Sequence, residues 1–158
     1  MAEKNTDFKK ALSQLEETLE IYLVKKAPFT IPENIKELIV SFAPYLVIIG
    51  VIFGVPAVLA VLGLGALVSP FSFLAGPSYA VSYGFNYILS MIIFGIVLVL
   101  EAMAVPGLFK RQKKAWQYLF YASLIGLVSS LLGGNILGGL IGALIGWYLL
   151  FQVKEYYK

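Results

Sequence analysis

Glu101 is the residue best placed to do chemistry in this sequence, because it is the one ionisable residue inside the long apolar runs. A carboxylate within a membrane span is costly to bury, so it is by default a candidate for ion or transport function. Glu101 also lies five residues before Pro106 and nine before Lys110, near the end of its apolar run. We therefore favour a structural role, in which the side chain reaches the interface or pairs with a cation, and keep transport as the alternative.

The sequence lacks the residues that most other kinds of catalysis require. The chain contains no Cys and no His, which removes thiol nucleophiles, Cys/His metal sites and His general bases. Ser123, Ser129 and Ser130 lie in an apolar run without a Lys or His to activate them. No phosphate-binding or dinucleotide-binding glycine motif is present. We expect no enzymatic activity, no cofactor and no metal.

A basic loop is the second chemical feature, and it consists of Lys110, Arg111, Lys113 and Lys114. One hypothesis is that it receives the acidic side chains of Glu16, Glu17 and Glu20. The rival is that it contacts anionic lipid, at about 1 kcal/mol per cation. A short basic loop beside a membrane argues against nucleic acid as a partner.

The elements that position these residues are membrane helices. Of the 158 residues 59% are hydrophobic and 13% are charged, and the mean hydropathy is +0.85. A soluble domain has about 45–50% apolar and about 25% charged residues. The sequence predicts an all-α, polytopic membrane helical bundle, with a cytoplasmic helix and linker at 1–29 and a four-helix transmembrane domain at 30–158. The expected spans are 45–68, 84–105, 115–132 and 135–153.

Charge sets the expected topology. With four spans, all twelve Lys and Arg residues fall on the side of the N-terminus, so both termini are expected in the cytoplasm. Trp116 and Trp147 sit toward the cytoplasmic ends of their spans, where we expect interface anchors. The opposite-side loop 69–83 is uncharged and offers an aromatic belt of Phe71, Phe73, Tyr79 and Tyr83.

An amphipathic helix is expected at residues 6–24, before the first span. Its apolar seam follows intervals of four and three residues and consists of Phe8, Leu12, Leu15, Leu19 and Tyr22. The helix packs on its own protein or the membrane surface, or it mediates oligomerisation, or it is partly frayed. A capping box with Thr30 as N-cap and Glu33 at the third position predicts the start of the next helix. Pro44 predicts a bend, and Pro56 a tolerated kink or a broken helix beside a substrate path.

Small residues at four-residue intervals predict close helix packing. Glycines at 134, 138, 142 and 146 form a glycine zipper in the last span, and Gly133-Gly134-Asn135 is the expected turn before it. The other small residues expected to pack are Ala122, Gly126 and Ser130 in the third span and Gly50 and Gly54 in the first. We favour a hairpin of spans three and four that uses the stripe internally; the alternative places the stripe between subunits.

Two phrases and the ending carry a resemblance. They are Ala27-Pro28-Phe29-Thr30-Ile31-Pro32-Glu33-Asn34, Pro106-Gly107-Leu108-Phe109-Lys110 and the segment Trp147–Lys158. In these patches the chain resembles small four-span proteins of the bacterial inner membrane whose function is uncharacterised. The resemblance implies a multi-pass location in a bacterial inner membrane and no activity.

The function expected from these features is structural. A small membrane protein that packs by its helices would act with the lipid bilayer and with a second copy or another membrane protein. The alternative is an oligomeric transporter or channel subunit that uses Glu101 and the Gly/Pro-interrupted first span. A third possibility is a lipid-sensing organiser that uses residues 6–24 and 110–114.

Overall fold

Helices account for most of the residues that the structure describes. The computed structural model describes residues 2–68, 71, 74 and 76–158, with the backbone alone at 2–6, 8, 61, 65–66, 68 and 77–83. Over the described residues the protein is all-helical, as the sequence predicts. The elements are α1 (Ala2–Glu20), the π-helix η1 (Ile21–Lys25), α2 (Glu33–Val68), α3 (Pro77–Phe109), α4 (Lys113–Leu132), α5 (Ile136–Gln152) and the 3-10 helix η3 (Lys154–Tyr156).

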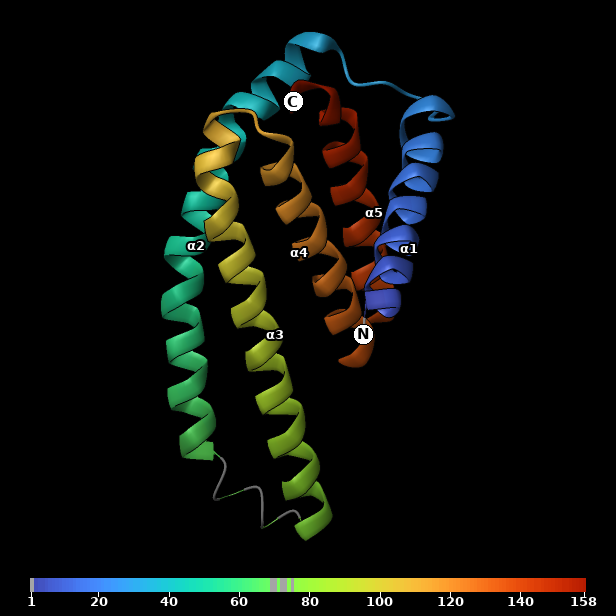
Figure 1. Ribbon diagram of the computed structural model, residues 1–158. Coiled ribbons are helices and arrows are strands. Elements are labelled where there is room, and N and C mark those ends of the chain that lie inside the picture. Colours follow the sequence, from blue (N-terminus) through green and yellow to red (C-terminus); the bar gives the residue numbers. More distant parts are fainter. Residues whose placement is uncertain (1, 69–70, 72–73, 75) are drawn as a thin grey trace.

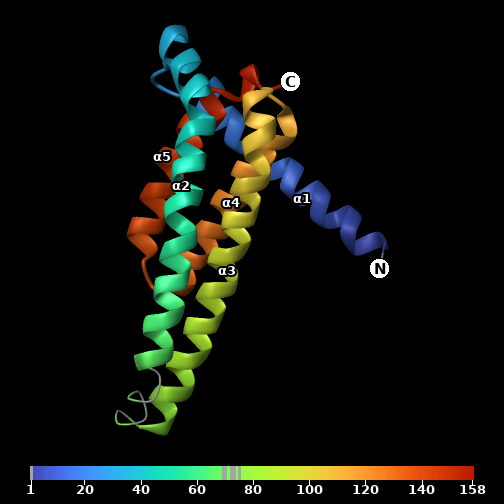
Figure 2. The same cartoon turned by 90° about the vertical axis from the view of Figure 1, so that its left-hand side faces the viewer.

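Each long helix packs against its neighbour along the chain. α3 lies between α2 and α4, and α5 packs on α4 and against η1 and α1 (Figure 1). α1 diverges from the bundle toward its first residue (Figure 2). At a rise of 1.5 Å per residue, α2 and α3 are about 54 and 50 Å long, whereas α4 and α5 are about 30 and 26 Å. The hairpin of α2 and α3 therefore extends beyond the hairpin of α4 and α5 (Figures 1 and 2).

Three helices are long and apolar enough to cross a bilayer. The qualifying segments are Glu33–Leu64, Gly84–Phe109 and Lys113–Leu132. The helix α5 is also apolar but has 17 residues, the lower end of the range of about 17–25 that a span requires. The four spans of the sequence prediction thus become three clear candidates and one short helix.

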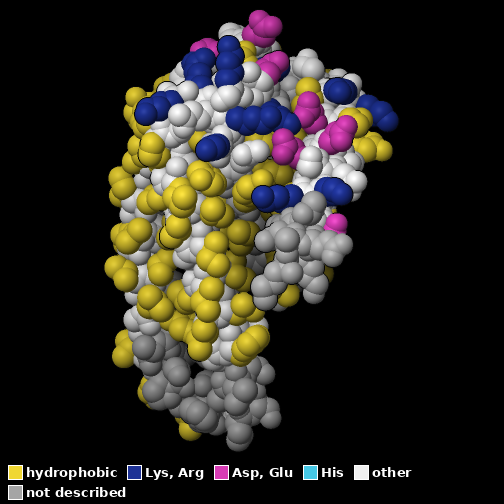
Figure 3. All heavy atoms as spheres, viewed as in Figure 1, with side chains coloured by type: hydrophobic (Ala, Val, Ile, Leu, Met, Phe, Trp, Pro, Cys, Tyr) yellow, Lys and Arg dark blue, Asp and Glu magenta, His cyan; other side chains and the backbone are white. Residues whose placement is uncertain are grey.

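The surface divides into a charged end and an apolar body. The charged side chains visible in Figure 3 gather at one end of the molecule, and hydrophobic side chains cover the rest of the described surface in that view. Large apolar side chains are exposed along the helices, for example Phe53 at 71%, Leu59 at 63% and Ile141 at 57%. Contiguous apolar surface of this extent calls for lipid or a partner.

Proline positions differ from the expected helix boundaries. α2 continues through Pro44 and Pro56, so the helix is not broken at either. Its first part runs obliquely in Figure 1 before the helix turns along α3, as a proline bend allows. Likewise α3 continues through Pro106, which the sequence placed at the end of the second span.

Two other helix starts are corrected. α2 begins at Glu33, and the amides of Ile35 and Lys36 bond to the carbonyl of Pro32, so Thr30 is not the N-cap that the capping box predicted. α3 begins at Pro77, so residues 77–83 of the expected loop are helical. Of the expected aromatic belt, Phe71 is 67% exposed, and the side chains of Phe73, Tyr79 and Tyr83 lie outside the described residues.

An aromatic core fills the charged end of the α4–α5 hairpin. The Trp116 ring stacks on Phe120 at 5.6 Å, and Phe151 meets both rings edge-on at 5.1 and 5.5 Å. Trp116 is 0% and Trp147 8% exposed, so neither ring is available to lipid headgroups, and the expectation of interface anchors was wrong. Their indole nitrogens donate inside the protein instead, Trp116 to the carbonyl of Leu150 and Trp147 to the hydroxyl of Ser123.

Candidate functional site: the charged end of the bundle

The C-terminal end of α5 holds the N-terminal segment in place. We call this contact region the polar junction. It consists of Tyr148, Gln152, Lys154 and Glu155 with their partners Glu16, Glu20, Leu23, Phe29, Ile31 and Lys36. The junction matters because it fixes α1 and the following linker relative to the bundle.

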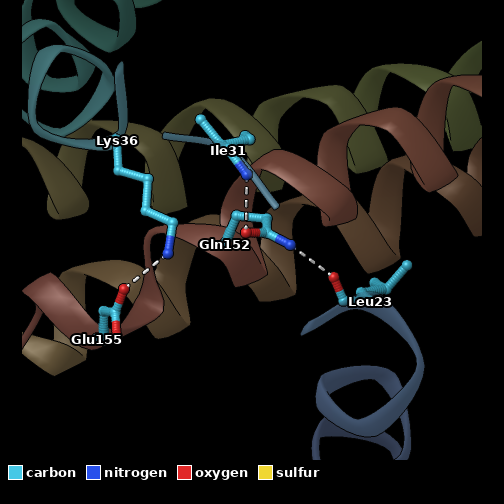
Figure 4. A network of polar contacts seen from close by, with 5 residues as sticks. All are labelled: Leu23, Ile31, Lys36, Gln152 and Glu155. Carbon is cyan, nitrogen blue, oxygen red and sulfur yellow. Dashed lines mark hydrogen bonds and ion pairs between the residues drawn. The ribbon is translucent and has the colours of Figure 1, made fainter. Parts of the chain in front are cut away.

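Gln152 lies at the centre of the junction and is 1% exposed. Its Nε2 donates to the carbonyl of Leu23 at 2.9 Å, and its Oε1 accepts the backbone N–H of Ile31 at 3.4 Å (Figure 4). The side-chain amide thus bridges η1 and the end of the linker that leads to α2. Tyr148 adds a third contact by donating its hydroxyl to the carbonyl of Phe29 at 2.6 Å.

Lys154 connects α1 to the aromatic core. Its ammonium pairs with Glu16 at 2.8 Å and with Glu20, and it lies 5.1 Å from the centre of the Trp116 ring. Burial lowers the pKa of Lys154, but hydrogen bonds to the two carboxylates raise it by more, so the net shift is upward. The charged form of Lys154 is therefore the form that fits this site.

The docking partner of α1 corrects the sequence hypothesis. Glu16 and Glu20 pair with Lys154 of the tail, not with the basic loop, and Glu17 is exposed. The expected apolar seam is also only partly used: Leu12 and Leu19 are half-buried, whereas Leu15 is 37% and Tyr22 61% exposed. The side chain of Phe8 lies outside the described residues.

The basic loop is tied to two other elements. Arg111 pairs with Glu37 of α2, an ion pair that raises the pKa of the guanidinium. The backbone of Lys158 donates to the carbonyl of Arg111 at 2.8 Å and accepts from the N–H of Lys113, also at 2.8 Å. Lys110, Lys113 and Lys114 make no ion pair within the described part of the chain. The last residue is thus fixed across the loop, beside three free cations.

The glycine zipper does not face α4. A Cβ atom added at Gly134, Gly142 or Gly146 would have nothing within 4 Å, and one at Gly138 would meet only the side chain of Asn135. The favoured use of the stripe inside the α4–α5 hairpin is therefore not what the structure shows. Gly134 serves the turn instead, since its φ of +78° suits glycine.

Other glycines mark the close helix contacts. A Cβ at Gly139 would lie 2.5 Å from Cβ of Ser130, and one at Gly107 would lie 2.8 Å from Cβ of Ala115. Neither glycine is among the packing residues expected from the sequence. The inner face of α5 has a signal in the sequence. Two small residues and then two aromatic ones follow at four-residue intervals: Gly139, Ala143, Trp147 and Phe151.

The remaining small residues have mixed positions. Gly54 lies against Leu98 of α3, whose nearest atom would be 2.5 Å from an added Cβ, whereas Gly50 and Gly126 have open space. Ala122 is buried and Ser130 meets Gly139.

Glu101 lies within the candidate span of α3 and is neither buried nor fully exposed. It makes no ion pair with any described residue, so the pairing with a neighbouring cation that the sequence suggested is not formed. No group of three or more potential metal ligands occurs in the described part of the chain.

Comparisons of the chain with family models, with curated proteins and with solved structures found no match. The polar junction contains paired charges and satisfied hydrogen bonds, and these interactions hold the N-terminal segment against the end of α5.

Proposed function

We propose that this protein is a small integral membrane protein of four spans that acts by helix packing, as a structural or assembly component. The carrying observation is the apolar surface of the bundle, on which large hydrophobic side chains stay exposed along α2, α3 and α5 while the charged groups gather at one end. Lipid would cover such a surface without cost. The short α5 would cross as the fourth span.

The proposed topology follows from the same division. The charged end, with both termini and the basic loop, would face the cytoplasm by the positive-inside rule. The resemblance to small four-span bacterial proteins supports a bacterial inner membrane as the location. The helix α1 would lie at the membrane surface or on its own protein.

Assembly would use the outer face of α5. Gly138, Gly142 and Gly146 are exposed there, and a stripe of small residues lets a second helix approach closely in lipid. The glycine zipper is thus proposed to act between subunits, with a second copy or another membrane protein.

The test is the mass of the protein extracted directly into lipid nanodiscs, beside a Gly142→Leu variant. An oligomer that Gly142→Leu dissociates, with circular dichroism unchanged, would support packing through this face. A wild-type monomer with no co-purifying membrane protein would contradict it. Gly50→Leu is the matched control, since an added Cβ at Gly50 also meets open space.

A second candidate function is transport, favoured by one observation: Glu101 lies in a candidate span without an ion-pair partner among the described residues. A proteoliposome assay of H⁺, Na⁺ and K⁺ flux would test it. Flux that Glu101→Gln abolishes would support a transport role, and equal flux in wild type and empty liposomes would exclude it for these ions. The continuous helix at Pro56 gives the broken-helix mechanism no support.

A further inference from the structure

Charges at the polar end of the molecule are unevenly paired. Glu16 and Glu20 share Lys154, while Glu37 and Glu155 pair with Arg111 and Lys36. Among the lysines without a carboxylate partner in the described chain, Lys110, Lys113, Lys114 and Lys158 gather at the basic loop and the last residue. The others with described side chains are Lys9, Lys10, Lys25 and Lys26, on or beside α1 and η1. The excess positive charge is therefore concentrated at the basic loop and the last residue.

Three of these lysines surround one hollow. Gln112, Lys113, Lys114 and Lys158 line an open cavity of about 400 Å³, which we call the lysine hollow. Two backbone hydrogen bonds join Lys158 to Arg111 and to Lys113, which precede it by 47 and 45 positions in the sequence. Behind Lys158, Tyr157 is 6% and Val153 3% exposed, so the tail is anchored in the core. The backbone hydrogen bonds and the buried tail therefore fix the backbone positions of the three lysines around the hollow.

The position of the hollow indicates its ligand. One candidate span ends at Phe109 and the next begins at Lys113, so the hollow lies where two spans leave the apolar zone. That is the depth of phospholipid phosphates when the helices cross a bilayer. The positive end of the α4 dipole lies at the same place and favours the same sign of ligand.

We propose that the lysine hollow binds a phosphate group, supplied by the headgroup of an anionic phospholipid. Lys113, Lys114 and Lys158 would contact the phosphate oxygens, and each ammonium can offer up to three donors. Glu37 and Glu155 line a neighbouring cavity together with Lys158, and Glu20 and Glu155 line another together with Lys113. Each of these carboxylates already has its own cation, because Glu37 pairs with Arg111, Glu155 with Lys36 and Glu20 with Lys154. The lipid source of the phosphate rests on the proposed membrane location; the affinity for phosphate does not.

The experiment compares two variants of equal charge. Delipidated protein in detergent is titrated with phosphatidylglycerol or phosphatidylcholine, and bound lipid is measured by native mass spectrometry. The site variant is Lys113→Gln/Lys114→Gln/Lys158→Gln, and the control is Lys9→Gln/Lys10→Gln/Lys25→Gln, which removes three exposed lysines elsewhere. We expect the wild type and the control to bind phosphatidylglycerol more tightly than phosphatidylcholine. The site variant should bind phosphatidylglycerol about tenfold more weakly or worse.

A second arm identifies the source of the phosphate. Thermal stabilisation by inorganic phosphate in the same detergent, lost in the site variant alone, together with no preference for phosphatidylglycerol, would assign the hollow to a soluble phosphate. Equal loss of lipid in the two variants, or no response to either anion, would overturn the proposal. Since this arm needs no bilayer, its result is independent of the number of spans.

Discussion

At the residue scale, two positions fix how the segments pack through contacts that the residue type alone does not predict. Gln152 lies near the end of an apolar helix and yet forms the centre of the polar junction. Gly139 sits beside the regular glycine stripe and is the position that α4 requires to be small. Gln152 bonds to two backbone groups and Gly139 lies against one side chain, so a single substitution can test each position.

Gly139→Leu should destabilise the α4–α5 hairpin, because an added Cβ would lie 2.5 Å from Cβ of Ser130 and the two helices would have to separate. We expect a loss of about 1–3 kcal/mol in the free energy of unfolding, the usual cost of overpacking. Thermal unfolding in one detergent, followed by circular dichroism, measures it. Gly126→Leu is the control, since a Cβ added at Gly126 would meet open space; a loss in the control as large as that in Gly139→Leu would contradict the assigned contact.

Gln152→Leu should free the linker between η1 and α2. The carbonyl of Leu23 and the amide of Ile31 would lose their partner, at a cost of about 1–3 kcal/mol for buried groups left unpaired. Hydrogen exchange of residues 24–32 is expected to accelerate while α3 and α4 keep their protection. Gln117→Leu, the same change in the second turn of α4, should leave the linker unaffected. Unchanged exchange in Gln152→Leu would mean that the junction is held by its ion pairs alone.

At the element scale, α1 depends on one short segment of the chain. It packs on α5, and the ion pairs of Glu16 and Glu20 both go to Lys154. The rest of α1 diverges from the bundle (Figure 2). Docking of this helix is therefore sensitive to a single ammonium group.

Alkaline pH should release α1. The pKa of Lys154 is raised by its carboxylates beyond the opposing effect of burial, so docking is fully stabilised below the ordinary lysine pKa of about 10.4 and weakens as pH rises through the raised value. Burial also raises the pKa of Tyr157, against an opposing effect of Arg111. Ionisation of Tyr157 at high pH would therefore destabilise the same end of the molecule. The chain has no native Cys, so spin labels at Ala11→Cys and Lys114→Cys can report the distance between α1 and α4.

The matched variant is Lys154→Gln. It should lengthen the distance between the labels already at neutral pH, by removing about 1–2 kcal/mol of docking free energy. Its label distance should then respond less to alkaline pH than that of the wild type. A wild-type distance that stays constant through the titration of lysine would show that the apolar contacts of α1 are sufficient.

At the scale of the whole molecule, the α2–α3 hairpin is longer than the α4–α5 hairpin. α2 and α3 extend past the turn between α4 and α5 (Figure 1), and the charged end is common to both hairpins. If four helices cross the bilayer, the tip near Leu74 and the turn near Gly134 emerge on the side opposite the termini.

Cysteine accessibility should therefore separate the two ends. Single variants Lys114→Cys and Lys158→Cys are expected to react with an impermeant maleimide only from the cytoplasmic side, and Phe71→Cys and Leu74→Cys only from the other. Phe71 and Leu74 are 67% and 87% exposed, so burial does not limit their labelling. Ile136→Cys tests the fourth span: labelling from the side opposite the termini supports it. Labelling of Ile136→Cys from the cytoplasmic side would leave three spans at most.

The sequence by itself determined the helical class, the turn at Gly133-Gly134-Asn135 and the collection of charge at a few chain positions. These features are local, because hydropathy and turn-forming residues act on the segment that contains them. Only the tertiary structure decided that Trp116 and Trp147 are buried, that Lys154 receives Glu16, and that Gly139 faces α4 while Gly142 faces outward. The physical reason is that α5 is apolar on every side before Gln152, so its sequence carries no polar face from which the direction of packing could be read.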